Sequence, residues 1–185
     1  MDTISLTGFM GSGKTSVGKE LAILLNRDFF DLDDMIVERE GRSVSRIFAE
    51  DGEQGFRNSE LAALKQFLKP RRRPSGQSAR GRVLALGGGT ILRPEALKLI
   101  RKYSTCIYLQ ASIDTLFGNL SGDCGSRPLL GGDNGLRERI EELLSAREEA
   151  YLAAADASVI TDGLSPAQVA RRIEALLQEN PLKLT

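Results

Sequence analysis

The sequence GFMGSGKTS, which begins at Gly8, matches the pattern of a phosphate-binding loop, in which glycine is followed five residues later by Gly-Lys-Thr. Glycines let backbone N–H groups turn inward around phosphate oxygens, and a helix that starts there adds a favourable dipole. Lys14 provides a mobile positive charge for the β- and γ-phosphates, and Thr15 provides a hydroxyl for magnesium. The alternative, a glycine turn that only joins a strand to a helix, leaves this Lys-Thr pair without a role. We therefore expect a nucleotide to contact Gly11, Ser12, Gly13, Lys14, Thr15 and Ser16.

A second group of charged residues follows in the sequence FFDLDD, residues 29–34. Residues two apart in a strand point to the same side, so we expect Asp31 and Asp33 to project together while Leu32 packs away. Two carboxylates beside a phosphate site repel ATP unless a metal ion intervenes or one of them faces a hydroxylated substrate. We assign Asp31 to the outer shell of a magnesium ion and Asp33 to the hydroxyl of a phosphate acceptor. The alternative, that these aspartates only end a strand and cap the next helix, fits Asp34 best.

Further candidate residues lie in four short motifs later in the chain. GEQGFR ends in Arg57, LALGGGT contains Gly87, Gly88 and Gly89, RPLL begins with Arg127, and REEAY begins with Arg147. Consecutive glycines directly after a strand leave backbone amides approachable at the edge where ligands of open α/β sheets bind. Any one of the arginines, taken alone, is more often a surface residue.

Short apolar segments that alternate with helical patterns predict the elements that position these residues. We expect strands at 4–7, 29–32, 83–86, 106–109 and 157–160, and helices at 17–25, 43–50, 59–68, 94–102, 113–120, 136–154 and from Ser165 onwards. Continuously apolar strands are typical of a parallel sheet covered on both faces, because parallel strands need crossover connections. The expected fold is therefore a three-layer α/β/α arrangement with a five-stranded parallel sheet.

Two segments interrupt this alternation. The basic segment 69–82 is most simply a solvated loop between a helix and a strand, although its five arginines also suit an anion. Segment 121–135 has glycines at both ends of the RPLL motif, as a hinged lid over a site needs.

Composition limits the kinds of partner. The chain has 185 residues, 41% of them apolar, which suits one domain that spans 1–185. Lys plus Arg number 25 and Asp plus Glu number 25, so no global charge attracts nucleic acid or a membrane. The absence of histidine excludes Ser-His and Cys-His nucleophile pairs and histidine metal sites. Without a long apolar run or a signal-peptide pattern at the start, we expect a cytoplasmic protein, and a monomer because the fold can cover its own sheet.

Taken together, these motifs resemble those of the shikimate kinases, P-loop phosphotransferases related in fold to the nucleoside monophosphate kinases. The similarity runs from about Ile4 to Leu177, and the phosphate-binding loop, the D-x-D pair, GRSVSRIFAEDGEQGFR, LALGGGT, RPLL and R-x3-Y occur in the family's order. The resemblance implies a P-loop NTPase fold with a substrate-binding helical segment at about 34–60 and a mobile lid at about 121–135. It also implies Mg²⁺-dependent transfer of the γ-phosphoryl group of ATP to the 3-hydroxyl of shikimate, in the pathway to chorismate and the aromatic amino acids.

The same resemblance implies roles for the acceptor residues. Asp33 receives the ring hydroxyls and can assist deprotonation, while Arg57 and Arg147 hold the shikimate carboxylate. The amides of the triple glycine contact the same substrate. This set agrees with the chemistry of the side chains, because a guanidinium fork matches a carboxylate in plane. Phe48 and Phe56 either line the ring pocket or are ordinary core aromatics.

On the nucleotide side, the resemblance implies that Arg127 moves in with the lid toward ATP and the transferring phosphate. Lys14, Mg²⁺ and Arg127 would neutralise most of the charge, and a loose transition state of this kind needs positioning more than a strong base. The family often has an arginine seven residues before the arginine of RPLL, where it stacks on adenine. This chain has Leu120 at that place, with Asn119 beside it.

Two other functions fit part of these features. A small-molecule kinase for another acceptor, such as a sugar acid, would share the phosphate-binding loop, although Asp33 with two arginines argues against a neutral acceptor. A non-catalytic nucleotide-binding or regulatory protein is favoured when Asp33, Arg57 or Lys14 is lost, and all three are present.

Overall fold

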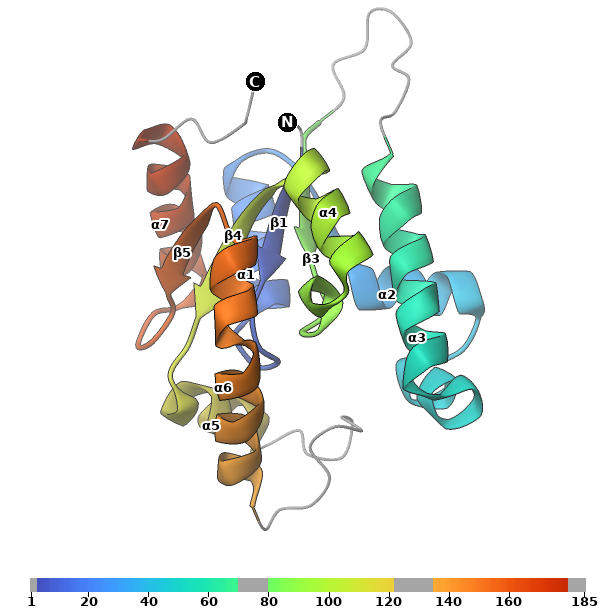
Figure 1. Cartoon of the computed structure of the whole chain (residues 1–185). Coiled ribbons are helices and arrows are strands. Elements are labelled where there is room, and N and C mark those ends of the chain that lie inside the picture. Colours follow the sequence, from blue (N-terminus) through green and yellow to red (C-terminus); the bar gives the residue numbers. More distant parts are fainter. Residues whose placement is uncertain (1–2, 70–79, 122–134, 180–185) are drawn as a thin grey trace, which may run out of the picture.

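A parallel β-sheet forms the centre of the computed structural model, which describes residues 3–69, 80–121 and 135–179 (Figure 1). The strands are β1 Thr3–Thr7, β2 Asp28–Asp31, β3 Arg82–Ala85, β4 Thr105–Gln110 and β5 Ala157–Ile160, in the order β2-β3-β1-β4-β5. All neighbouring strands are parallel, and Ile4 of β1 pairs with Val83 on one side and Thr105 on the other. The predicted parallel sheet of five strands is confirmed, with β2 and β3 each one residue earlier than expected.

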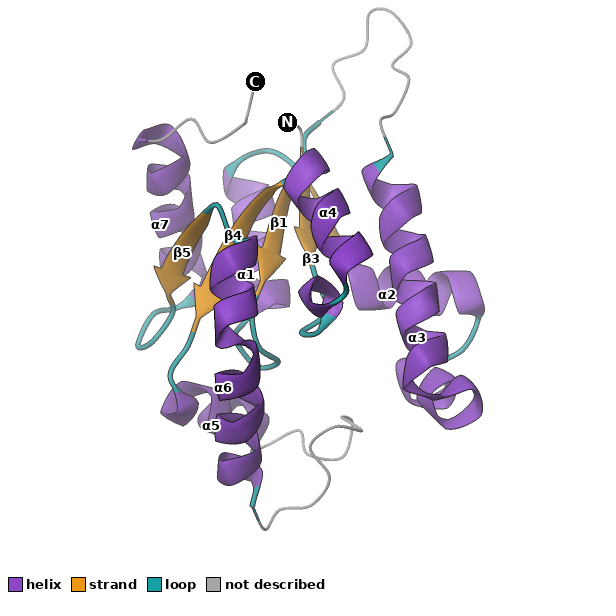
Figure 2. Ribbon diagram, viewed as in Figure 1, coloured by secondary structure: helices purple, strands orange, loops and turns teal. Residues whose placement is uncertain are grey.

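Helices cover both faces of the sheet (Figure 2). They are α1 Lys14–Leu24, α2 Leu32–Glu40, α3 Val44–Leu68, α4 Pro94–Tyr103, α5 Ile113–Leu120, α6 Leu136–Ala154 and α7 Pro166–Glu179, with a short 3-10 helix at Thr90–Leu92. One buried cluster joins the sheet to α1 and α7, and a larger one joins its other face to α2 through α6. Two apolar clusters on opposite faces of one sheet make the three-layer arrangement that the sequence predicts.

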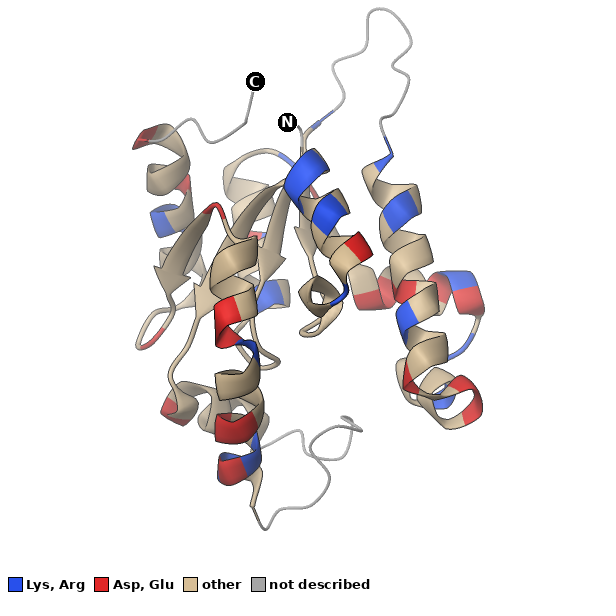
Figure 3. Cartoon of the chain, in the orientation of Figure 1, with Lys and Arg blue, Asp and Glu red and all other residues tan. Residues whose placement is uncertain are grey.

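The chain after α2 forms the long helical element α3. The predicted helices 43–50 and 59–68 both lie within α3, and they belong to two helical stretches that Gly52 separates, because its φ of 70° and ψ of −178° are not helical. A positive φ of this kind suits glycine, so the chain turns sharply at this residue between the two stretches. Ion pairs from Arg42 to Glu50 (2.8 Å) and Asp51 (2.6 Å) tie the connection after α2 to α3, where Figure 3 shows both charge signs close together.

Some sequence expectations fall on other parts of the chain. Residues 70–79 of the basic segment and most of the expected lid, including Arg127, lie outside the described residues. None of the helices in the described ranges combines the length and the apolar character that a membrane span requires.

Candidate active site

The phosphate-binding loop leaves β1 and leads into α1 through three glycines with positive φ, Gly8, Gly11 and Gly13. At Gly8 a side-chain carbon would lie 2.7 Å from the carbonyl oxygen of Leu109, so this close approach of two backbones requires glycine. Within the described ranges no side chain caps the start of α1, and its first turn holds no acidic residue. The N–H groups and the positive end of the helix dipole are therefore directed at the loop, where a phosphate group would be stabilised.

The Lys14 side chain folds back over this loop. Its Nζ donates hydrogen bonds to the carbonyl oxygens of Gly8 at 2.9 Å and Phe9 at 2.8 Å. The ammonium group thus lies against the backbone that would surround the phosphates.

Asp31 joins the phosphate-binding loop to the second helix. Its Oδ2 accepts a hydrogen bond from Thr15 Oγ1 at 2.7 Å, and its Oδ1 accepts one from the backbone N–H of Asp33 at 3.0 Å. Asp31 is therefore the N-cap of α2, which satisfies one of the free N–H groups of the first turn. The hydroxyl and the carboxylate are oxygen donors of the kind that Mg²⁺ prefers.

The position of Asp33 corrects the sequence prediction. Strand β2 ends at Asp31, so Asp33 lies in the first turn of α2 rather than on the same strand. The expected cap, Asp34, is likewise wrong, because Asp31 has that role. The side chain of Leu32 is fully buried, as expected, and both Asp31 and Asp33 still face one cavity.

Asp33 is the most perturbed carboxyl group of the site. Burial, assisted by the negative charges of Asp31 and Glu60, raises the pKa of Asp33 to about 6, although Lys14 and Arg57 oppose the rise. Its Oδ1 is buried and has no hydrogen-bond partner among the described residues. A buried oxygen of this kind can accept a hydrogen bond from a hydroxyl group of a ligand. Carboxyl groups with a shifted pKa are common in functional sites.

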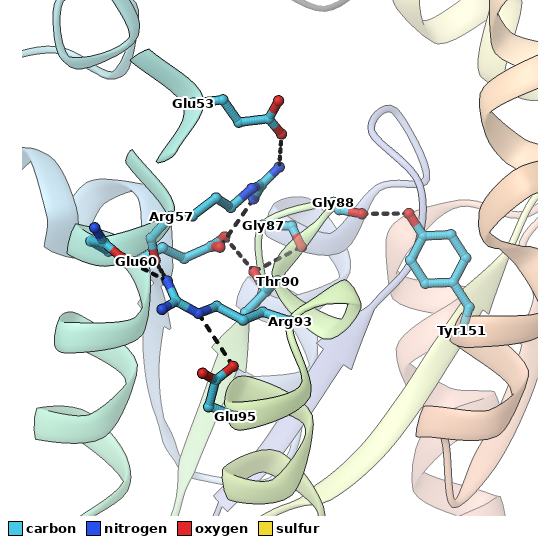
Figure 4. A network of polar contacts seen from close by, with 10 residues as sticks. Glu53, Arg57, Glu60, Gly87, Gly88, Thr90, Arg93, Glu95 and Tyr151 are labelled. Carbon is cyan, nitrogen blue, oxygen red and sulfur yellow. Dashed lines mark hydrogen bonds and ion pairs between the residues drawn. The ribbon is translucent and has the colours of Figure 1, made fainter. Parts of the chain in front are cut away.

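Arg57 is held by two glutamates of its own helix (Figure 4). Its guanidinium lies 3.0 Å from Glu60 and 3.4 Å from Glu53, and Glu60 also accepts a hydrogen bond of 2.6 Å from Thr90 Oγ1. Glu60 is only 1% exposed, so its charge is compensated inside the protein by these partners. Sequence reasoning missed Glu60, although its place three residues after Arg57 puts both on one face of a helix.

The triple glycine after β3 lies where side chains would collide with this network. A carbon added to Gly87 would come within 2.7 Å of Glu60 Oε1, and one added to Gly89 within 2.5 Å of Arg57 Nη2. The carbonyl of Gly88 accepts a hydrogen bond from the hydroxyl of Tyr151 on α6 (Figure 4). A side chain at Gly87 or Gly89 would thus displace the end of Glu60 or Arg57 from its present position, so glycine at both places preserves this network.

One cavity of about 320 Å³ brings these groups together. Its lining contains ten of the residues singled out from the sequence: Lys14, Asp31, Asp33, Phe48, Phe56, Arg57, Gly87, Gly88, Gly89 and Arg147. We call it the charged cavity, because three cationic and three anionic side chains line it, the last of them Glu60. Its size suits a small molecule. Its charged side chains suit one that has both an acidic and a hydroxylated part.

A second cavity of about 300 Å³, which we call the neutral cavity, adjoins the other side of the phosphate-binding loop. Its lining residues are Ser12, Gly13, Val17, Thr115, Asn119, Thr161, Gly163 and Leu164. Asn119 Nδ2 donates a hydrogen bond of 2.9 Å to the carbonyl oxygen of Gly11, whereas the neighbouring Leu120 is 1% exposed and packs in the core. Asn119 rather than Leu120 therefore faces the space beside the loop.

The walls of the neutral cavity are tied together by Asp162. Its Oδ1 accepts hydrogen bonds from the backbone N–H of Ser112 at 2.9 Å and from the hydroxyls of Ser112 at 2.8 Å and Thr115 at 2.5 Å. These bonds connect the loop after β5 to the first turn of α5.

Comparison with known proteins identifies the family. A family model described as "Shikimate kinase" matches residues 10–178. The chain belongs to the shikimate kinase family. Among curated shikimate kinases, that of Geobacter sulfurreducens is 41% identical over 177 residues, covering 96% of this chain and 91% of the relative. That of Thermodesulfovibrio yellowstonii is 40% identical over 173 residues, covering 94% and 93%.

Solved shikimate kinases have the same fold. The enzyme from Acinetobacter baumannii, solved in complex with shikimate, has a TM-score of 0.87 at 30% identity and covers 98% of this chain and 95% of that chain. The enzyme from Aquifex aeolicus has a TM-score of 0.76 at 29% identity, covering 98% and 99%. The predicted family and P-loop NTPase fold are thus confirmed, and the chain is an ATP-dependent kinase of the shikimate kinase family.

Proposed function

We propose that this protein uses Mg²⁺ and ATP to phosphorylate the 3-hydroxyl of shikimate, and that it does so as a cytoplasmic monomer. The observation that carries the proposal is the charged cavity itself. It contains the lysine of a phosphate-binding loop, a buried carboxyl oxygen without a partner and two arginines. A ligand that fits these groups has a carboxylate at one end and a hydroxyl directed at a phosphate donor at the other.

The acceptor is held at both ends. Arg57 and Arg147 bind its carboxylate, and the orientation of Arg57 is set in advance by Glu60 and Glu53. Asp33 accepts the hydrogen bond of the reacting hydroxyl, while amides of Gly87, Gly88 and Gly89 contact the ring substituents. Because the bound acceptor is already held in one orientation, the chemical step does not include the loss of translational and rotational entropy that a reaction in solution would require.

The nucleotide phosphates occupy the phosphate-binding loop, with backbone contacts from Gly11 to Ser16 and the Lys14 ammonium on the β- and γ-phosphates. Thr15 and Asp31 are the residues that would hold Mg²⁺, Thr15 with its hydroxyl and Asp31 in the outer shell of the ion. Their oxygens are 2.7 Å apart and both are hard donors, which suits an ion that keeps several water ligands. The chemistry that Mg²⁺ would supply at these residues is partial neutralisation of the phosphate charge.

In the reaction the hydroxyl oxygen of the acceptor forms a bond to the γ-phosphorus as the bond to the bridging oxygen of ADP breaks. The hydroxyl proton passes to Asp33, which is mostly ionised above pH 6 because its pKa is about 6. Lys14 stabilises the charge that develops on the β–γ bridge. We further propose that Arg127 contributes from a lid at 121–135, within a single domain 1–185 whose acceptor segment is about 34–60.

The test is ADP release from Mg-ATP by the purified protein with shikimate, quinate, gluconate or no acceptor. We expect stimulation by shikimate alone, because the other compounds place their hydroxyls and carboxylate differently relative to Asp33 and the arginines. Equal stimulation by gluconate would support a sugar-acid kinase instead. Binding of ATP without release in any of these reactions would overturn the catalytic proposal and favour a regulatory one.

A further inference from the structure

Tyr151 is a buried tyrosine beside the charged cavity that does not itself line it. It lies on α6, four residues after Arg147, so the two side chains share one face of the helix. Tyr151 is fully buried, and its hydroxyl donates a hydrogen bond to the carbonyl oxygen of Gly88. Burial raises the pKa of Tyr151, and the positive charge of the nearby Arg147 guanidinium opposes that rise.

Gly88, in turn, packs against the phosphate-binding loop. A carbon added to Gly88 would lie 3.3 Å from the backbone nitrogen of Met10 and 3.7 Å from the carbonyl oxygen of Gly8. The peptide that Tyr151 holds is therefore the one that lies between the charged cavity and the phosphate site. A shift of this peptide would move the acceptor relative to the phosphate donor.

The ring of Tyr151 is fixed independently of its hydroxyl. It stacks on Tyr108 of β4, with centroids 5.2 Å apart and an interplanar angle of 17°. Tyr108 is 1% exposed and is not part of the charged cavity lining. The stack thus offers two buried tyrosines in contact: the hydroxyl of Tyr151 is bonded to Gly88, and Tyr108 serves as a matched control.

From these contacts we propose that Tyr151 is a positioning residue, whose hydroxyl aligns Arg147 and the Gly88 peptide for the acceptor. This role rests on the proposed phosphorylation of shikimate and assigns a specific task to a residue outside the cavity. The hydroxyl links helix α6, the triple glycine and, through Gly88, the phosphate-binding loop. Its loss leaves a carbonyl oxygen without its donor and gives Arg147 more freedom, so the acceptor carboxylate is held less firmly.

The test compares Tyr151→Phe with Tyr108→Phe, since each removes one hydroxyl and keeps the aromatic stack. We expect Tyr151→Phe to raise the KM for shikimate about ten-fold, and to leave the KM for ATP within about two-fold of wild type. Tyr108→Phe should change neither constant by more than about two-fold, and thermal unfolding should show that both variants are folded at the assay temperature. An unchanged KM for shikimate in Tyr151→Phe, or equal increases for both substrates, would overturn the proposal.

A double-mutant cycle with Arg147→Ala separates positioning from general destabilisation. If Tyr151 acts through Arg147, the substitution Tyr151→Phe should cost much less in the Arg147→Ala background than in wild type. An equal cost in both backgrounds would overturn the role. Wild-type protein assayed in parallel distinguishes the two levels of failure: absence of shikimate-dependent ADP release removes the proposed function and this role together, whereas an active wild type with an unaffected Tyr151→Phe removes only the role.

Discussion

The two cavities beside the phosphate-binding loop differ in the charge of the side chains that line them. The charged cavity is lined by three cationic and three anionic side chains, and their orientation is set by contacts such as the one between Arg57 and Glu60 at 3.0 Å. The neutral cavity contains only small, apolar or uncharged polar residues, and Asn119 in it contacts backbone rather than another side chain. Under the proposed function, the acceptor would therefore be selected by side-chain charge, whereas the nucleotide would be held mainly by backbone groups and one lysine.

Lys14 lies at the border between the cavities, so its removal should have the largest effect. Lys14→Ala should lower the rate of phosphoryl transfer by on the order of a thousand-fold or more, because the ammonium stabilises charge that develops only in the transition state. Binding of shikimate, measured by calorimetry without nucleotide, should persist. Lys19→Ala, on the exposed side of the same helix, is the control. Loss of shikimate binding in Lys14→Ala would show that the two sites are not separable.

Arg57→Ala should impair binding in the charged cavity and leave the neutral cavity unaffected. We expect a loss of tens- to thousands-fold in kcat/KM for shikimate, on the order of 2–5 kcal/mol, since the acceptor carboxylate and Glu60 both lose their partner. The KM for ATP should stay nearly constant. Arg46→Ala removes an exposed ion pair with Glu50 and should leave both constants unchanged. Equal losses for ATP and shikimate would contradict the division between the cavities.

Asp33, in the charged cavity, should affect the free energy of unfolding. Its pKa is about 6 in the folded protein, above the usual 3.8, so the folded state binds a proton more readily than the unfolded chain. The ionised form therefore destabilises the fold above pH 6, and stability returns as the pH falls from about 6 to 4. Asp33→Asn should raise the free energy of unfolding at pH 8 by up to about 3 kcal/mol, with activity lost.

Urea unfolding without ligands at pH 8 and pH 5 measures this effect. The advantage of Asp33→Asn should shrink at pH 5, where the wild-type carboxyl group is mostly protonated. Thr115→Val, in the neutral cavity, provides the contrast: it removes a hydrogen bond to Asp162 and should destabilise the protein at both pH values. If Asp33→Asn raised the free energy of unfolding by the same amount at both pH values, the pKa of Asp33 would not be raised by burial.

Local patterns explain which features of the site could be predicted. The phosphate-binding loop and the triple glycine follow from short motifs at strand ends, and their residues line the two cavities. The path of residues 31–34 could not be predicted from alternation, because the side chain of Asp31 starts a helix and so ends the strand early.

Contacts between distant segments were beyond the reach of the sequence. Glu60 and Thr90 are thirty positions apart, and only the packing of α3 against the triple glycine brings them within hydrogen-bond distance. The same holds for Tyr151 and Gly88, which are sixty-three positions apart. The spacing to RPLL places Leu120 where the family often has an arginine beside the adenine. In the fold, the orientation of α5 places Leu120 in the core and Asn119 at the loop.

Asn119 gives the smallest and most specific prediction. Its Nδ2 is committed to the Gly11 carbonyl, which fixes the amide and steadies the phosphate-binding loop from the neutral side. Asn119→Ala should raise the KM for ATP by about two- to five-fold, the effect of one exposed neutral hydrogen bond, with the KM for shikimate unchanged. Gln178→Ala, at an exposed position of α7 that lines neither cavity, is the control. If Asn119→Ala instead raised the KM for shikimate, the two cavities would be coupled through the loop, and recognition by charge and by backbone would not be independent.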